Sequence, residues 1–98
     1  MAKKIIWSKA AVESFNEVII YLQDNWSERE VIRFVKFTSN VLNIINSGMV
    51  KFRVSEGRKN VHEVLITKHN LLVYREKKDR IELVLFFDTR QQPIKKRK

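Results

Sequence analysis

The sequence predicts an α+β fold in which a short N-terminal strand and an α-helical hairpin pack on a small antiparallel β-sheet. Before Gly48, apolar residues recur every three or four positions, as on a helix with one buried face. After it come short runs rich in β-branched and aromatic residues, separated by polar turns. With 98 residues, 44% of them hydrophobic, the chain can form one modest core but not two domains. We therefore expect residues 1–98 to form a single domain with a basic tail over about residues 92–98.

The chain begins with a predicted strand at residues 5–7 and a first helix. Ser8 offers a hydroxyl that can cap the free backbone N–H groups of a helix running from Lys9 to about Asn25. The helical period places five apolar side chains on the predicted core face of this helix: Val12, Phe15, Ile19, Leu22 and Trp26.

A second helix is predicted immediately after the first. Ser27 and Glu30 have the spacing of a capping box, in which a hydroxyl and a carboxylate satisfy backbone donors at a helix start. Residues 46–48 end the helix with a glycine, which tolerates a left-handed conformation. The predicted core face consists of Val31, Phe34, Val35, Thr38, Val41, Leu42 and Ile45. Because the turn between the helices is short, they should run antiparallel.

Three strands are predicted in the second half, at residues 61–66, 70–75 and 81–87. Their connections are short enough for hairpins, so consecutive strands should pair antiparallel. The third run is apolar at both alternating sets of positions, which is typical of a central strand. We expect the helices to cover one face of this sheet and a partner to cover the other. Residues 49–60 read as a basic connection with room for one further short strand.

The chain is strongly basic, and the excess charge lies in its second half. Residues 1–50 contain six basic and five acidic residues, a net charge of +1, whereas residues 51–98 contain fourteen and six, a net charge of +8. The total of +9 favours a polyanion or an acidic protein as partner over a neutral small molecule. The candidate binding residues are Lys51, Arg53, Arg58, Lys59, Lys68, Arg90 and Gln91.

Several classes of site are excluded by composition. The chain has no cysteine, so disulfides, cysteine nucleophiles and thiolate metal sites are impossible, and His62 and His69 alone cannot form an ordinary zinc site. We expect no metal and no organic cofactor. Neither a signal peptide nor a membrane-spanning segment is evident, which predicts a cytoplasmic protein that does not enter a membrane.

Four segments together resemble the RelE/ParE superfamily of toxins from bacterial type II toxin–antitoxin systems. They are residues 6–11, residues 19–22 with Trp26, residues 64–75 and residues 86–91. The resemblance implies a growth-inhibiting toxin that a cognate antitoxin neutralises in a hetero-oligomer. It also implies that operator DNA is bound only through the antitoxin. In this superfamily RelE-like members cut messenger RNA on the ribosome, whereas ParE-like members poison DNA gyrase.

The sequence keeps little of the RelE-like catalytic pattern. His62 and Val64 stand where that pattern has lysines, Leu71 stands where it has an arginine, and no tyrosine or histidine follows Gln91. Arg90 matches. A reduced, metal-independent ribonuclease site would use His62 as general acid or base beside Arg90, with Arg75 also on the phosphate. Alternatively, His62 and His69 are ordinary strand-edge and turn residues.

The ParE-like mechanism requires long helices and a basic face but no catalytic constellation. The two predicted helices, of about seventeen and nineteen residues, are long by ordinary standards. We therefore favour gyrase poisoning, with RelE-like cleavage of messenger RNA as the alternative. Two further alternatives are a noncatalytic RNA-binding module using the basic residues of the 49–60 segment and a degenerate toxin that retains only antitoxin binding.

Overall fold

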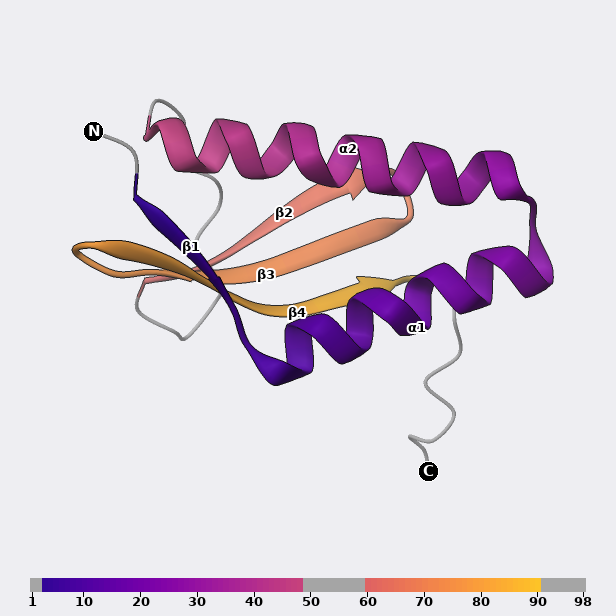
Figure 1. Cartoon of the computed structure of the whole chain (residues 1–98), viewed down its shortest axis with the longest axis horizontal. Coiled ribbons are helices and arrows are strands. Elements are labelled where there is room, and N and C mark those ends of the chain that lie inside the picture. Colours follow the sequence, from indigo (N-terminus) through magenta and orange to yellow (C-terminus); the bar gives the residue numbers. More distant parts are fainter. Residues whose placement is uncertain (1–2, 49–59, 91–98) are drawn as a thin grey trace.

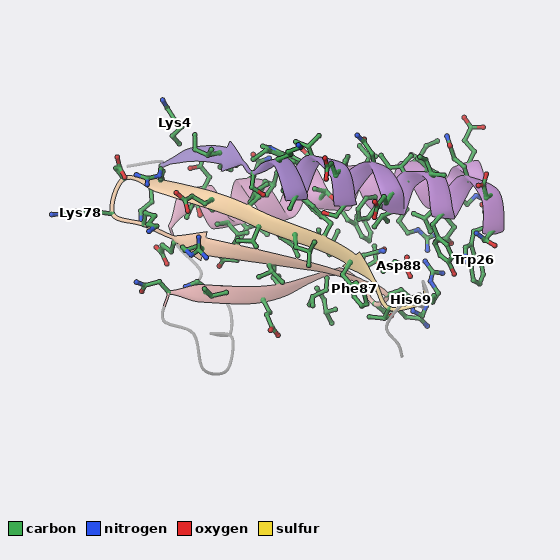
Figure 2. The ribbon with its side chains drawn as sticks, turned by 90° about the horizontal axis from the view of Figure 1, so that it is seen from below. Lys4, Trp26, His69, Lys78, Phe87 and Asp88 are labelled. Atoms are coloured by element: carbon green, nitrogen blue, oxygen red, sulfur yellow. The ribbon has the colours of Figure 1, made fainter. Side chains whose placement is uncertain are left out.

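A computed structural model describes residues 3–48 and 60–90. Its elements are β1 (Lys4–Trp7), α1 (Lys9–Asn25), α2 (Glu28–Ser47), β2 (Val61–Thr67), β3 (Asn70–Glu76) and β4 (Arg80–Asp88). The two helices lie side by side on one face of the sheet, and in the described part of the chain no helix covers the other face (Figures 1 and 2). The α+β class is confirmed. The basic tail and nearly all of the 49–60 segment lie outside the described residues.

The helix boundaries follow the capping residues. The Ser8 hydroxyl accepts a hydrogen bond from the Ala11 backbone N–H at 2.9 Å, and the Ser27 hydroxyl accepts one from the Glu30 N–H at 3.4 Å. Gly48 follows α2 with a φ of 75°, a left-handed conformation that costs little without a Cβ. These residues set the lengths of 17 residues for α1 and 20 for α2, close to those predicted.

The sheet is mixed, whereas the sequence predicted an antiparallel one. Its strand order is β1-β4-β3-β2, and β2, β3 and β4 form the predicted antiparallel meander. β1 pairs parallel with β4, with Ile5 opposite Ile81. Apolar periodicity predicts that a strand exists but not its neighbour, so the parallel pairing could not be derived from it. The interior place of β4, between β1 and β3, agrees with the prediction.

The core fills the space between the helices and the sheet, and its centre is aromatic. The Phe86 ring lies 5.3 Å from the Trp7 ring, 5.0 Å from that of Phe15 and 6.2 Å from that of Phe34, measured between ring centroids. Phe86 therefore joins β1, α1, α2 and β4. The buried hydrophobic residues around it include Ala11, Val18, Leu22, Ile45, Val64, Leu72, Ile81 and Leu83.

The buried face of α1 agrees with the predicted one only in part. Leu22 is buried and Phe15 and Ile19 pack against the core as predicted, but Val12 and Trp26 are 45% and 53% exposed. The other buried residues of α1 are Ala11, Ser14 and Val18. In α2, Val35 was also expected in the core and is exposed. Ala11 and Ser14 are small, and Ser14 contacts β4 directly through the Phe86 backbone N–H. A pattern based on large apolar residues therefore misses the small buried residues of this helix.

Ser14 ties α1 to β4 through a buried hydrogen bond. β1 ends at Trp7, and beyond this point the Phe86 backbone N–H donates to the Ser14 hydroxyl at 2.9 Å. The same hydroxyl donates to the Ala10 carbonyl at 2.6 Å. Along Arg80–Leu83 the edge of β4 is paired with β1, and at Phe86 the serine side chain supplies the hydrogen-bond acceptor instead.

Replacing Ser14 with alanine should leave the Phe86 N–H buried without its acceptor. We expect the free energy of unfolding to fall by about 1–3 kcal/mol, the desolvation cost of one unsatisfied buried donor. Urea unfolding of the purified protein measures this loss, and Ser39→Ala on the exposed surface of α2 is the matched control. Equal stabilities for the two variants would contradict the assigned role of Ser14.

Candidate functional site

Polar side chains gather where β4 and the β2–β3 hairpin end together. The register places Thr67 opposite Asn70 and Asn70 opposite Asp88, so three polar residues lie in a row across three strands. The Asn70 amide donates to the Asp88 carboxylate at 2.7 Å, and the Thr67 hydroxyl donates to the Asn70 side-chain oxygen at 2.5 Å. Asp88 is completely buried and Asn70 is 2% exposed. This row fixes the position of the carboxylate at the end of the sheet.

Arg90 folds back onto this carboxylate. Its Nε donates to Asp88 Oδ1 at 3.1 Å and its Nη2 donates to Asp88 Oδ2 at 3.0 Å, a bidentate arrangement. The Arg90 backbone N–H donates to Oδ1 as well, at 2.8 Å. On its other side the guanidinium lies over the Trp26 ring, with Cζ 4.5 Å from the ring centroid. The Arg90 side chain is thus held between a buried carboxylate and an indole.

The pKa values of this pair reflect their mutual contact. Burial alone would raise the pKa of Asp88, but hydrogen bonds from the Arg90 side chain and backbone and from Asn70 outweigh it and lower the pKa. The hydrogen bond to Asp88 raises the pKa of Arg90 against the opposing effect of burial. Both groups are therefore charged at neutral pH.

A pocket of about 380 Å³ lies beside Arg90. The turn between α1 and α2, helix α2 itself and the β2–β3 hairpin all contribute to the pocket. Figure 2 shows Trp26, His69 and Asp88 at this end of the molecule. The lining contains three cations, one carboxylate, two apolar aromatic rings and one imidazole. The lining residues are Trp26, Glu30, Arg33, Phe37, Thr67, Lys68, His69 and Arg90.

His62 lies near the opposite end of β2 from this pocket. Its ring is buried and stacks on the Tyr74 ring with centroids 5.0 Å apart. Its Nε2 lies 3.5 Å from Glu76 Oε1, and the same carboxylate accepts a hydrogen bond from Lys3 Nζ at 3.0 Å. His62 therefore lies on the edge strand β2, as one interpretation expected, and its buried ring is part of a polar cluster with Glu76 and Lys3.

The proposed couple of His62 and Arg90 is not formed. Thr67, the residue level with Asp88, is five positions further along β2 than His62, which is roughly 17 Å at ~3.4 Å per residue. Arg75 also lies at the far end, where its Nη1 is 3.3 Å from Glu82 Oε1. The structure therefore places His62 and Arg75 at one end of the meander and Arg90 at the other, a separation that depends on the strand register and could not be read from the sequence pattern.

Of the predicted binding residues, Lys68 and Arg90 line one pocket. The others, Lys51, Arg53, Arg58, Lys59 and Gln91, lie outside the described residues. Sequence reasoning missed the contribution of Trp26, Arg33 and Phe37, which come from the helical hairpin. The position of Trp26 in the turn, immediately before the Ser27 cap, was the available signal, because a tryptophan there has little helix surface to pack against.

Other kinds of site receive no support within residues 3–48 and 60–90. No cluster of three or more His, Cys, Asp or Glu side chains that could hold a metal ion occurs among these residues. No helix among them has the length and apolar character needed to cross a membrane.

Comparison with known proteins finds solved structures that share the fold of this chain. No family model and no curated protein sequence matches the chain. Among solved structures, a chain of the chromosomal ParDE system of P. aeruginosa is similar with a TM-score of 0.72 and 11% identity, over 89% of this chain and 96% of that one. A copper-bound mutant toxin from Helicobacter pylori is similar with a TM-score of 0.67 and 17% identity, over 90% of this chain and 94% of that one. A chain of the E. coli DinJ–YafQ toxin–antitoxin complex is similar with a TM-score of 0.65 and 7% identity, over 90% of this chain and 93% of that one.

These similarities cover almost the whole length of each protein. The described chain therefore has the RelE/ParE-like fold. Identities of this size establish the fold alone.

Proposed function

We propose that this chain, with its RelE/ParE-like fold, is the toxin component of a type II toxin–antitoxin system. The observation that carries the proposal is the near-complete overlap of the fold with several proteins of such systems, one of them in a toxin–antitoxin complex. The chain is also strongly basic, as expected of a protein whose partners are acidic or polyanionic.

An antitoxin is the expected partner, and the uncovered face of the sheet supports this. Ile6, Leu65 and Leu85 are 39%, 57% and 39% exposed, and their cross-strand registers place them on the face opposite the helices. Apolar side chains in this number on an open sheet are typical of a surface that a partner covers. We propose that a segment of the cognate antitoxin packs there in a cytoplasmic hetero-oligomer, and that any contact with operator DNA is made by the antitoxin.

Among the toxic mechanisms, we favour ParE-like poisoning of DNA gyrase. The separation of His62 from Arg90 supports it, because the ribonuclease alternative needs an acid or base next to the cation that stabilises the phosphate. The Arg90 guanidinium is moreover already hydrogen-bonded to both carboxylate oxygens of Asp88. The long helices of 17 and 20 residues agree with the same choice.

Expression of the chain alone should arrest bacterial growth, and the ribonuclease alternative can be separated from the favoured one in the same experiment. In a reconstituted translation reaction, primer extension should show full-length message in the presence of the purified protein. Ribosome-dependent cuts would instead establish RelE-like cleavage. A chain with its core disrupted, such as Phe86→Ala, is the control and should not arrest growth. Continued growth with the folded wild-type chain would contradict the toxin role.

A further inference from the structure

The pocket beside Arg90 combines cations with exposed aromatic rings. Arg33, Lys68 and Arg90 line it together with one carboxylate, Glu30, while Asp88 lies buried behind Arg90 and does not line it. Within the described parts of the chain, neither Arg33 nor Lys68 forms an ion pair, so their charges are available to a ligand. A pocket lined in this way attracts an anion.

The aromatic side chains indicate what else the ligand carries. Trp26 is 53% exposed and Phe37 is 40% exposed, so both rings present part of their surface to a ligand in the pocket. One face of Trp26 is occupied by the Arg90 guanidinium, and this contact fixes the orientation of the indole. A flat aromatic group can stack on such rings while its anionic part reaches the cations, and base–aromatic stacking of this kind contributes ~1–3 kcal/mol per base.

We propose that this pocket binds a nucleotide, with the phosphate on Arg33 and Lys68 and the base against Phe37 and the exposed part of Trp26. Its volume of about 380 Å³ lies within the range of small-ligand pockets, roughly 300–1,000 Å³. A free mononucleotide and a nucleotide within a single strand share this chemistry. The proposal concerns binding only, and it does not rest on the proposed toxin role, because neither gyrase nor the ribosome is needed for it.

Titration of the purified full-length chain tests this proposal through the fluorescence of its two tryptophans. The probes are adenosine monophosphate, a short single-stranded oligonucleotide, adenosine and inorganic phosphate. We expect adenosine monophosphate and the oligonucleotide to quench the fluorescence saturably, with an affinity that falls as the salt concentration increases. Adenosine or phosphate alone should bind much more weakly. Tighter binding of the oligonucleotide than of the mononucleotide would identify a nucleic acid strand as the source, and the reverse order would identify the free nucleotide.

Variants locate the binding and provide the outcomes that overturn the proposal. Arg33→Ala and Lys68→Ala should each weaken binding about tenfold, the effect of losing one charge-assisted contact. Lys36→Ala, on the same helix but outside the pocket lining, is the matched control and should bind like the wild type. Trp26→Phe should remove most of the quenching, because the remaining tryptophan, Trp7, does not line the pocket.

An equal loss of affinity with Lys36→Ala would show general attraction of anions and overturn the pocket assignment. Inorganic phosphate binding as tightly as the mononucleotide would overturn the stacking contribution. The absence of saturable binding by either nucleotide probe would overturn the proposal as a whole. All four substituted residues are exposed, so circular dichroism should report native structure in each variant.

Discussion

Replacing Phe86 with alanine should lower the free energy of unfolding by about 3–5 kcal/mol, the cost of removing a buried aromatic side chain. Phe86 is 2% exposed and its ring contacts those of Trp7, Phe15 and Phe34. Because these rings come from β1, α1 and α2, the cavity left by the substitution would separate every element that packs on this part of β4. For a domain of this size the loss is a large part of the total stability.

Chemical denaturation with urea measures the effect of this substitution. Phe87→Ala is the matched control, because Phe87 is the next residue of β4, points to the opposite face of the sheet and is only half-buried. We expect a clearly smaller loss for the control. Equal losses in the two variants would mean that the aromatic cluster is not the centre of the core.

The second large effect is expected at Asp88. Substituting alanine for this residue removes the acceptor of four hydrogen bonds, three from Arg90 and one from Asn70. Breaking a buried ion pair by removal of one partner typically costs 3–5 kcal/mol, and we expect about 3 kcal/mol here because Arg90 can turn toward solvent. The Asp88→Ala, Arg90→Ala double variant should lose less than the sum of the single variants. Strict additivity would show that the two side chains are not coupled.

The same carboxylate predicts a pH dependence of stability. Its pKa is lower in the folded chain than the ordinary value of about 3.9, so the folded state favours the ionised form. The stabilisation is fully present above the unfolded pKa and is lost as the pH falls through the folded pKa. The stability difference between wild type and Asp88→Ala should therefore be constant near neutral pH and shrink below about pH 4. Urea unfolding at a series of pH values measures it, and a difference that grows on acidification would contradict the assignment.

Local sequence signals were enough to predict most of the fold. The helix ends are set by Ser8 and Ser27, whose hydroxyls accept backbone hydrogen bonds, and by Gly48, which adopts a left-handed conformation. Each of these signals involves residues only a few positions apart in the sequence. The strands of the meander were likewise predicted within one or two residues at their ends. The parallel pairing of β1 with β4 was not predicted, because it depends on the path of the chain through both helices.

The candidate site was predicted only in part, for a related reason. Lys68 and Arg90 were singled out by charge and position, and the structure places both in one pocket. The expected contact between Arg90 and His62 is not formed, because the meander register separates the two residues by the length of a strand. No local sequence pattern contains that register. Asp88 passed unnoticed as a partner of Arg90, although a buried acid two residues before a basic one at a strand end is a local signal.

The inhibition of DNA gyrase is the most direct test of the account. Purified chain is added to gyrase, relaxed plasmid and ATP, and the conversion to supercoiled plasmid is followed on agarose gels. We predict that the wild-type chain inhibits supercoiling in a dose-dependent manner and that the destabilised Phe86→Ala chain does not. Full supercoiling activity in the presence of folded chain that arrests growth in cells would contradict the proposed target and favour the ribosome.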